Sequence, residues 1–331
     1  MDLETIIRPI EAEQPWGKKM RVIVTGATGF IGKALCKELL NQGNEVFAVI
    51  RPQSPKKNQL EVENELLHIL EIPMETICDL WERYHVKADV FYHLAWNGSS
   101  GADRDQFEIQ QKNVGFVASA IYAAKACGCK KIIGAGSQAE YGIVRRKAKE
   151  GKTVPHPFMM YGAAKLASYY MGTVLAKQLG ITLIWPRIYS VYGVGENQGT
   201  LIDYVLEQVL KGNRPELSSC DNMWNFLEIS DCVKMLILLA ESDDAEGIYH
   251  IASKDTRVLR EYVEELRDLA APKIELGFGY RKTDRKRTFW MEPDITKLLQ
   301  IIGKDYEFVS FRDGVMKLKE EMEKKKDFMF G

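Results

Sequence analysis

Cysteine pairs and long apolar runs, which mark special classes of protein, are both missing from this sequence. The chain of 331 residues holds six cysteines, and the closest two, Cys127 and Cys129, fit neither a disulfide framework nor a zinc motif. The longest apolar stretch, near residues 235–240, is far shorter than the roughly 20 residues that span a bilayer. We therefore expect reduced cysteines, no metal site and no membrane-spanning segment.

Net charge is also nearly absent. The 45 lysines and arginines against 46 aspartates and glutamates leave a formal net charge of −1. Such a balance provides no long-range field that would draw the protein to nucleic acid or to an anionic membrane. Because the charged N-terminus lacks the apolar core of a signal peptide, we expect a cytoplasmic protein without nucleic-acid or membrane partners.

The sequence does contain a regular alternation of two periodicities. Short β-branched runs predict strands at 21–25, 45–50, 67–72, 90–93, 131–134 and 181–185. Helical patterns follow several of these strands, the clearest at 32–41, 107–126 and 161–179. Strands joined by helices pair in parallel, because a parallel pair needs a crossover connection. The pattern predicts an α/β fold with a doubly wound parallel sheet of the Rossmann type.

The pattern divides the chain into unequal parts. Residues 1–20 precede the first strand and are expected to form an arm outside the sheet. The sheet pattern covers 21–190 and 226–252, which we assign to a dinucleotide-binding Rossmann domain. The remaining segments, 191–225 and 253–331, are expected to form a smaller C-terminal lobe that binds substrate.

The first strand leads directly into a glycine-rich turn. Residues 22–32 read VIVTGATGFIG, with Gly26, Gly29 and Gly32 three positions apart. Between a strand and a helix, such a turn lets backbone N–H groups approach a pyrophosphate, and the helix N-terminus adds a favourable dipole. The stretch predicts a dinucleotide site, although a tight turn without a ligand could use the same glycines.

Six further motifs follow this turn along the chain. They are HLAW (93–96), GSQAEYG (136–142), YGAAK (161–165), PRIYSVYG (186–193), WNF (224–226) and PDITK (293–297). Together with TGATGFIG, the series resembles the extended, nucleotide-sugar-modifying branch of the short-chain dehydrogenase/reductase superfamily. The resemblance covers nearly the whole chain, from Arg21 to about Val315.

The resemblance implies a catalytic trio of Ser137, Tyr161 and Lys165. Residues four apart share one face of a helix, so the tyrosine and the lysine can reach one pocket. A nearby cation favours the phenolate, so Lys165 would help Tyr161 to transfer protons near neutral pH. The family's lysine also binds the cofactor ribose, and Ser137 would hydrogen-bond the reacting sugar oxygen.

The expected cofactor is NADP, with NAD possible. Dinucleotide-binding folds specific for NAD usually carry an acid at the end of the second strand, whereas this chain has Arg51 followed by Ser54, Lys56 and Lys57. An arginine there can accommodate a 2′-phosphate, but it can also stack on adenine or face solvent. The expected cofactor contacts are Gly26, Thr28, Gly29, Phe30, Ile31, Arg51, Leu94, Ala95, Tyr161, Lys165, Pro186 and Ile188.

Departures from the family pattern reduce the number of reactions that fit this sequence. Gln138 and Ala139 replace the Asp-Glu pair of the 4,6-dehydratases, which argues against elimination of water. An NADP site fits a reductase of a nucleotide-linked 4-keto-6-deoxy sugar, which exchanges its cofactor at every turnover. A nucleotide-sugar 4-epimerase that retains NAD is the alternative enzyme, and a non-catalytic dinucleotide sensor is the alternative outside catalysis.

The substrate is expected to be a nucleotide diphosphate sugar. Its contacts are predicted at Trp96, Gln138, Ser190, Trp224 and Arg285. Trp224 could stack on a nucleobase or belong to the core, and Arg285 could bind the diphosphate or lie on a solvated basic face.

A homodimer is also implied, because extended members of the superfamily commonly pair two helices from each subunit. In this chain the helices would be 107–126 and 161–179. Small residues on them would let the helices of two subunits approach closely about a two-fold axis. The expected interface stripes are Phe116, Ala120 and Ala123 on the first helix and Ala164, Ser168 and Met171 on the second.

Overall fold

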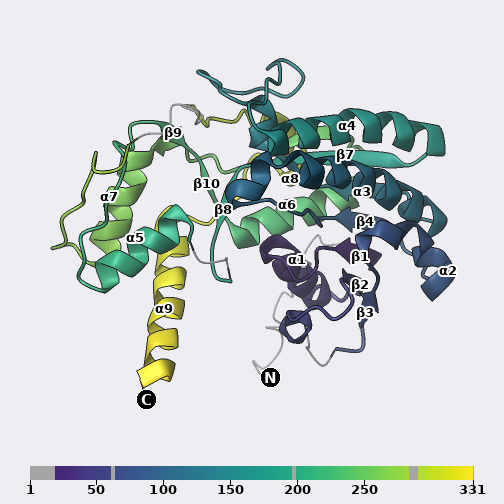
Figure 1. Cartoon of the computed structure of the whole chain (residues 1–331), viewed down its shortest axis with the longest axis horizontal. Helices are drawn as coiled ribbons and strands as arrows, with labels where there is room; N and C mark the ends of the chain where they lie inside the picture. Colours follow the sequence, from purple (N-terminus) through teal and green to yellow (C-terminus); the bar gives the residue numbers. More distant parts are fainter. Residues whose placement is uncertain (1–18, 61–63, 196–198, 283–289, 331) are drawn as a thin grey trace, which may run out of the picture.

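A parallel sheet occupies the centre of the protein. The computed structural model describes residues 19–60, 64–195, 199–282 and 290–330, and side chains as far as Lys324. Within these residues the sheet has eight strands, and its main path runs in the order β3-β2-β1-β4-β5-β7-β11 (Figure 1). The strands are β1 (Arg21–Thr25), β2 (Glu45–Ile50), β3 (Leu67–Glu71), β4 (Val90–His93), β5 (Lys131–Gly134), β6 (Gly136–Ser137, beside β7), β7 (Thr182–Ile188) and β11 (Gly247–Ile251).

The strand order reverses between β1 and β4. From β1 the chain proceeds to β2 and β3 on one side, and then returns to β4 on the other side. The paired residues Thr25 and His93 end these two strands at the same level. In open parallel sheets, ligands bind at the carboxyl ends of strands where the order reverses. The fold thus predicts a site beside these two residues.

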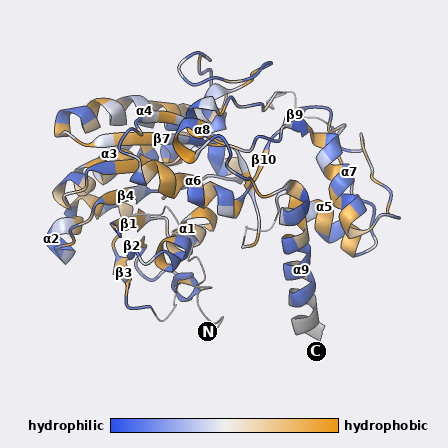
Figure 2. Cartoon of the chain, turned by 180° about the vertical axis from the view of Figure 1, so that it is seen from behind, coloured by the Kyte–Doolittle hydropathy of each residue, from blue (hydrophilic) through white to orange (hydrophobic). Residues whose placement is uncertain are grey.

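Helices cover both faces of the sheet. Val22 and Val24 of β1 belong to the core formed with α1 (Phe30–Asn41) and α6 (Ile229–Glu241). Ile23, which points to the opposite face, belongs to the core formed with α3 (Phe107–Ala126) and α4 (Met160–Leu179). Because both faces are buried, the central strands are apolar along most of their length (Figure 2).

A third apolar core lies outside the sheet. It is built by α5 (Leu201–Leu210), α7 (Leu259–Ala270) and the first turns of α9 (Phe311–Phe330). Two short ladders lie between this core and the sheet: β8 (Ser190–Tyr192) with β10 (Phe226–Glu228), and β9 (Met223–Trp224) with β12 (Arg257–Val258). The remaining elements are α2 (Leu80–Tyr84), α8 (Thr296–Ile302) and the 3₁₀ turns η1 (Lys57–Gln59), η2 (Met74–Asp79), η3 (Gly101–Asp105) and η4 (Gln138–Tyr141).

The predicted fold class is confirmed, and the strands expected from the sequence are present. Within the segment 226–252, β11 pairs with β7 at the edge of the sheet, and α6 packs in the core on one face of the sheet. The third core lies where the sequence places the substrate lobe, and the domain boundaries themselves stay a prediction. Residues 1–18 of the expected arm lie outside the described residues.

The interface stripe expected on α3 and α4 is wrong at four positions. Ala120, Ala123, Ala164 and Ser168 are buried inside the subunit, since α3 and α4 pack against each other and against the sheet. Their small size serves close packing within one chain. Of the two other predicted positions, Phe116 is half-buried and Met171 is exposed. The further exposed apolar side chains on these helices are Phe107, Tyr122, Met160, Tyr170 and Val174.

None of the six cysteines forms a disulfide, and five of them are buried. Burial raises the pKa of the Cys36 thiol to about 12, which leaves it uncharged. No helix of the described residues has the length and apolar character needed to cross a membrane.

Candidate active site

The glycine turn after β1 packs directly on the end of β4. Gly26 has a positive φ of 71°, and a Cβ atom there would lie 2.7 Å from the backbone nitrogen of Ala95. A Cβ atom on Gly32 would collide with the carbonyl oxygen of Gly26. Only glycine fits these two positions, because the turn lies against the backbone after β4 at Gly26 and against the first turn of α1 at Gly32.

The N-terminus of α1 is left open toward this turn. Its N-cap, Gly29, has no side chain that could accept from the first N–H groups, and the first turn carries no acidic residue. The free N–H groups and the helix dipole favour an anion there. The turn therefore fits a pyrophosphate, which is the group that the sequence predicts.

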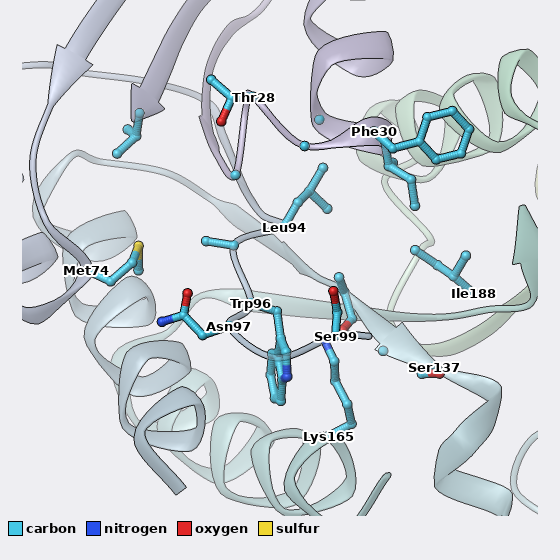
Figure 3. Close-up of a pocket in the computed structure, with 18 of the residues that line it drawn as sticks. Thr28, Phe30, Met74, Leu94, Trp96, Asn97, Ser99, Ser137, Lys165 and Ile188 are labelled. Carbon is cyan, nitrogen blue, oxygen red and sulfur yellow. Dashed lines mark hydrogen bonds between the residues drawn. The ribbon is translucent and has the colours of Figure 1, made fainter. Parts of the chain in front are cut away.

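A cavity of about 540 Å³ extends from this turn across the carboxyl ends of the strands. At one side lie residues from the end of β2 and from the segments that follow β2 and β3, and at the other lie Ser137, Tyr161 and Lys165. Figure 3 shows Thr28 and Phe30 on the glycine turn and Trp96 beside Lys165. Three of the lining side chains are cationic, Arg51, Lys56 and Lys165, and no carboxylate is among them. The cavity thus suits an elongated anionic ligand.

Tyr161 and Ser137 meet at one side of the cavity. Tyr161 lies in the first turn of α4, and Ser137 ends β6 and caps η4, where its Oγ accepts from Ala139 N at 3.2 Å. Burial raises the pKa of the Tyr161 phenol, and a hydrogen bond from Ser137 acts in the opposite direction. The serine and the tyrosine are therefore placed to share one ligand oxygen.

Lys165 lies one helical turn after Tyr161 and is buried. Its Nζ donates to the carbonyl oxygen of Ala135 at 2.5 Å and lies 3.4 Å from the centroid of the Trp96 ring. Burial lowers the pKa of Lys165 to about 7, since desolvation penalises the ammonium form. Trp96 is fixed in turn by Gln110, whose Oε1 accepts from the indole N–H at 3.0 Å.

A buried ion pair holds the serine loop from behind. The Oε1 of Glu140 accepts from the backbone N–H of Ser137 and from the indole N–H of Trp185, both at 2.9 Å. Its Oε2 accepts from Arg187 Nε at 2.7 Å, and both side chains of this pair are almost fully buried. The sequence analysis missed this pair, although its two members stand inside the GSQAEYG and PRIYSVYG motifs.

Basic side chains gather at the end of β2. Arg51 is exposed and lines the cavity together with Lys56. Lys57 instead pairs with Glu71, the last residue of β3, at 2.9 Å, and this contact holds the pKa of that carboxyl below its usual value. Glu71, the acid near these cations, is therefore paired with Lys57 from the segment between β2 and β3.

The cavity brings together most of the residues predicted from the sequence. Pro186, Gln138, Ser190 and Trp224 do not line it, and Arg285 lies outside the described residues. Trp224 packs against Phe226 at the junction of two apolar cores, so the structure favours a core role for this tryptophan. The predicted residues that do line the cavity are Gly26, Thr28, Gly29, Phe30, Ile31, Arg51, Leu94, Ala95, Trp96, Ser137, Tyr161, Lys165 and Ile188.

Several lining residues were not predicted. Most of them lie at the carboxyl ends of strands or just after them, which is the signal that could have found them. They are Val49, Ile50, Ile72, Met74, Asn97, Ser99, Ala135, Gly136, Tyr189 and Val191. In the described part of the chain, no three His, Cys, Asp or Glu side chains are grouped as metal ligands.

The family follows from a comparison with known proteins. The model of the NAD dependent epimerase/dehydratase family matches residues 22–252, most of the chain. The chain belongs to this family. It is an NAD(P)-dependent enzyme of the extended short-chain dehydrogenase/reductase type, as its relatives are.

Two curated relatives of this family member are sugar reductases. GDP-6-deoxy-D-mannose reductase of Pseudomonas aeruginosa is 27% identical over 270 residues, which cover 77% of this chain and 82% of that protein. The dTDP-4-dehydro-6-deoxyglucose reductase of Escherichia coli is 25% identical over 279 residues, covering 79% of this chain and 85% of that protein.

Among solved structures, the family member is similar to UDP-glucuronic acid 4-epimerase from Bacillus cereus in complex with UDP-glucuronic acid and NAD. The TM-score is 0.79 at 21% identity, and the match covers 92% of this chain and 99% of that chain. At this identity the likeness supports the fold alone.

Proposed function

We propose that this enzyme reduces the carbonyl group of a nucleotide-linked 4-keto-6-deoxy sugar with NADPH. The observation that carries the proposal is the cavity itself, which has Ser137, Tyr161 and Lys165 at one side and the cations Arg51 and Lys56 at the other. No carboxylate is among its described lining residues. The reductases among the curated relatives support the same reaction class.

The side chains around Tyr161 suit this proton transfer. The cofactor, when bound, supplies the hydride that the carbonyl carbon accepts. The phenol of Tyr161 then gives its proton to the carbonyl oxygen, which the hydroxyl of Ser137 holds in place. Lys165 supports the tyrosine with its charge and would bind the cofactor ribose. We assign Gln138 and Ser190, which adjoin lining residues in the chain, to the substrate side.

A 4-epimerase is the second candidate, because the family model that matches the chain is that of NAD dependent epimerases and dehydratases. Both reactions need the same serine, tyrosine and lysine. They differ in the fate of the cofactor, because an epimerase returns the hydride to its substrate whereas a reductase releases an oxidised cofactor at each turnover.

A panel of nucleotide-linked sugars separates the two functions. The purified protein is incubated with 4-keto-6-deoxy sugars and NADPH or NADH, and with the corresponding hydroxy sugars without added cofactor. A stoichiometric loss of reduced-nicotinamide absorbance with a keto sugar supports the reductase. Interconversion of two hydroxy sugars with no net change in cofactor supports the epimerase, and activity with neither class contradicts both enzymes.

The cofactor preference is expected to depend on Arg51. Wild-type protein should bind NADPH more tightly than NADH, and Arg51→Asp should weaken NADPH binding about 10- to 100-fold, because a charge-assisted contact to the 2′-phosphate is replaced by repulsion. Fluorescence titration with both cofactors measures this change, and NADH affinity serves as the internal control. Equal affinities of the wild type for the two cofactors would contradict the role of Arg51 in NADPH preference.

We further propose a homodimer formed by the outer faces of α3 and α4. Tyr122 and Tyr170 are exposed there, as is Met171 with 62% of its surface accessible. Large apolar side chains gathered on adjacent helices are typical of a contact surface. Met171→Glu should halve the mass measured by light scattering, whereas Val154→Glu, on an exposed loop, should not change it. A monomeric wild type at micromolar concentration would contradict the proposal.

A further inference from the structure

Arg104 lies directly over the ring of the proposed catalytic tyrosine. It belongs to η3, in the segment between β4 and α3, and its Cζ atom is 4.5 Å from the centroid of the Tyr161 ring. A guanidinium at this distance from an aromatic face is attracted by the ring electrons. Arg104 is not among the side chains that line the cavity, so its contact is with the tyrosine itself.

The backbone on both sides of Arg104 is fixed. The Nε2 of Gln110 donates to the carbonyl oxygen of Asp103 at 2.9 Å. On the other side, Oδ1 of Asp105 accepts from the backbone N–H of Met160 at 3.1 Å, in the turn that carries Tyr161. These two hydrogen bonds hold the segment that carries Arg104 beside the first turn of α4, where Tyr161 lies.

The guanidinium of Arg104 has no carboxylate partner. Other partly or fully buried arginines are paired, for example Arg187 with Glu140 and Arg257 with Glu265. Arg104 forms no ion pair with any residue that the structure describes, and its Nε is buried without a hydrogen-bond partner. A cation held in this way is costly unless a negative charge arises beside it.

Lys165 and Arg104 are both cations near Tyr161, and the guanidinium of Arg104 is the nearer of the two to the ring. Lys165 Nζ lies 5.6 Å from the centroid of the Tyr161 ring, farther than the guanidinium, and it is engaged by Ala135 and Trp96. Burial lowers the pKa of Lys165 to about 7, because desolvation penalises the ammonium form. A guanidinium, by contrast, stays charged in proteins.

We propose that Arg104 is a positioning residue that holds Tyr161 and stabilises the phenolate which this tyrosine becomes during turnover. The inference rests on the proposed function. The O–H bond of Tyr161 breaks as the O–H bond of the product alcohol forms, the carbonyl carbon gains the hydride, and the phenolate is later reprotonated by solvent. The positive charge of Arg104 stabilises the negative charge of the Tyr161 phenolate until the phenolate is reprotonated.

The charged groups around Tyr161 predict the direction of the effect. The hydroxyl of Ser137 and the charge of Arg104 lower the pKa of the phenol, whereas burial, the largest effect, and the charge of Glu140 raise it. Lys165 lies on the next turn of α4, with its Nζ 5.6 Å from the centroid of the Tyr161 ring. A positive charge beside a phenol favours the phenolate, so removal of Arg104 should raise the pKa of Tyr161.

Arg104→Gln and Arg104→Lys test the proposal, with Arg145→Gln as the control at an exposed arginine. The glutamine variant should lower kcat for reduction about 10-fold with little change in KM, and should move the alkaline limb of the pH profile to higher pH. The lysine variant keeps a positive charge, so its kcat and its pH profile should lie between those of the glutamine variant and the wild type. Carbon-13 NMR of labelled tyrosine, with the Tyr161 signal identified by its loss in Tyr161→Phe, measures the pKa in the NADP⁺-bound protein.

The outcomes separate this inference from the proposed function. A glutamine variant whose Tyr161 pKa and pH profile match those of the wild type overturns the inference, as does a rise in KM alone, which would mean that Arg104 binds an anionic substrate group. If no keto sugar is reduced by the wild type, the proposed function fails, and the NMR comparison still decides whether Arg104 controls the phenol.

Discussion

Replacing Tyr161 with phenylalanine should reduce turnover about 10²- to 10⁴-fold while cofactor affinity stays nearly unchanged. The substitution removes only the hydroxyl that donates the proton, and the ring that packs against Trp96, at 6.0 Å between centroids, remains. The ligand oxygen would then be held by Ser137 alone, without an acid beside it. Steady-state kinetics with the best substrate of the panel and a cofactor titration measure the two effects.

Tyr170→Phe provides a matched control on the same helix. Tyr170 lies on α4 but is exposed, far from the cavity, so loss of its hydroxyl should leave turnover unchanged. If Tyr161→Phe turned over at a near-normal rate, the proton would have to come from another group. That result would contradict the roles proposed for Tyr161, Ser137 and Arg104.

The sheet could be predicted because its determinants are local. The run from Val22 to Thr25 is short, apolar and followed by glycine, so strand, turn and helix are each specified within a few residues. The same holds for the cofactor turn, where Gly26 and Gly32 are required by contacts that every such turn makes. Motif order then placed Ser137, Tyr161 and Lys165 at one cavity, and the structure brings them together there.

The contacts that could not be predicted are those between distant segments. Arg104 and Tyr161 are separated along the chain by α3, β5, β6 and η4, and no periodicity links them. The interface stripe failed for a related reason. Ala120 and Ser168 have the pattern of a helix contact, but the sequence does not say whether the contact is with the same subunit or with a second one.

The pair of Glu140 and Arg187 depends on the fold in the same way, since it joins η4 to β7 across the buried side of the active site. Burial leaves neither charge any water to interact with. An ion in such a place is tolerable only while its partner is present, so breaking the pair should cost more than the pair itself contributes.

Arg187→Met should therefore lower the free energy of unfolding by about 3–5 kcal/mol, as measured by urea denaturation, because it leaves the carboxylate of Glu140 buried without a counter-ion. As a control, Lys147→Met breaks the half-exposed pair with Glu292 and should cost less than about 1 kcal/mol.

Adding Glu140→Gln to the Arg187→Met variant should recover at least about half of the loss, because the neutral amide removes the isolated charge. Its carbonyl oxygen can still accept from the backbone N–H of Ser137 and the indole N–H of Trp185, so the serine loop keeps its support. A double variant no more stable than Arg187→Met would contradict the charge argument and would mean that lost packing of the arginine side chain against the Tyr141 ring, at 4.3 Å, dominates instead.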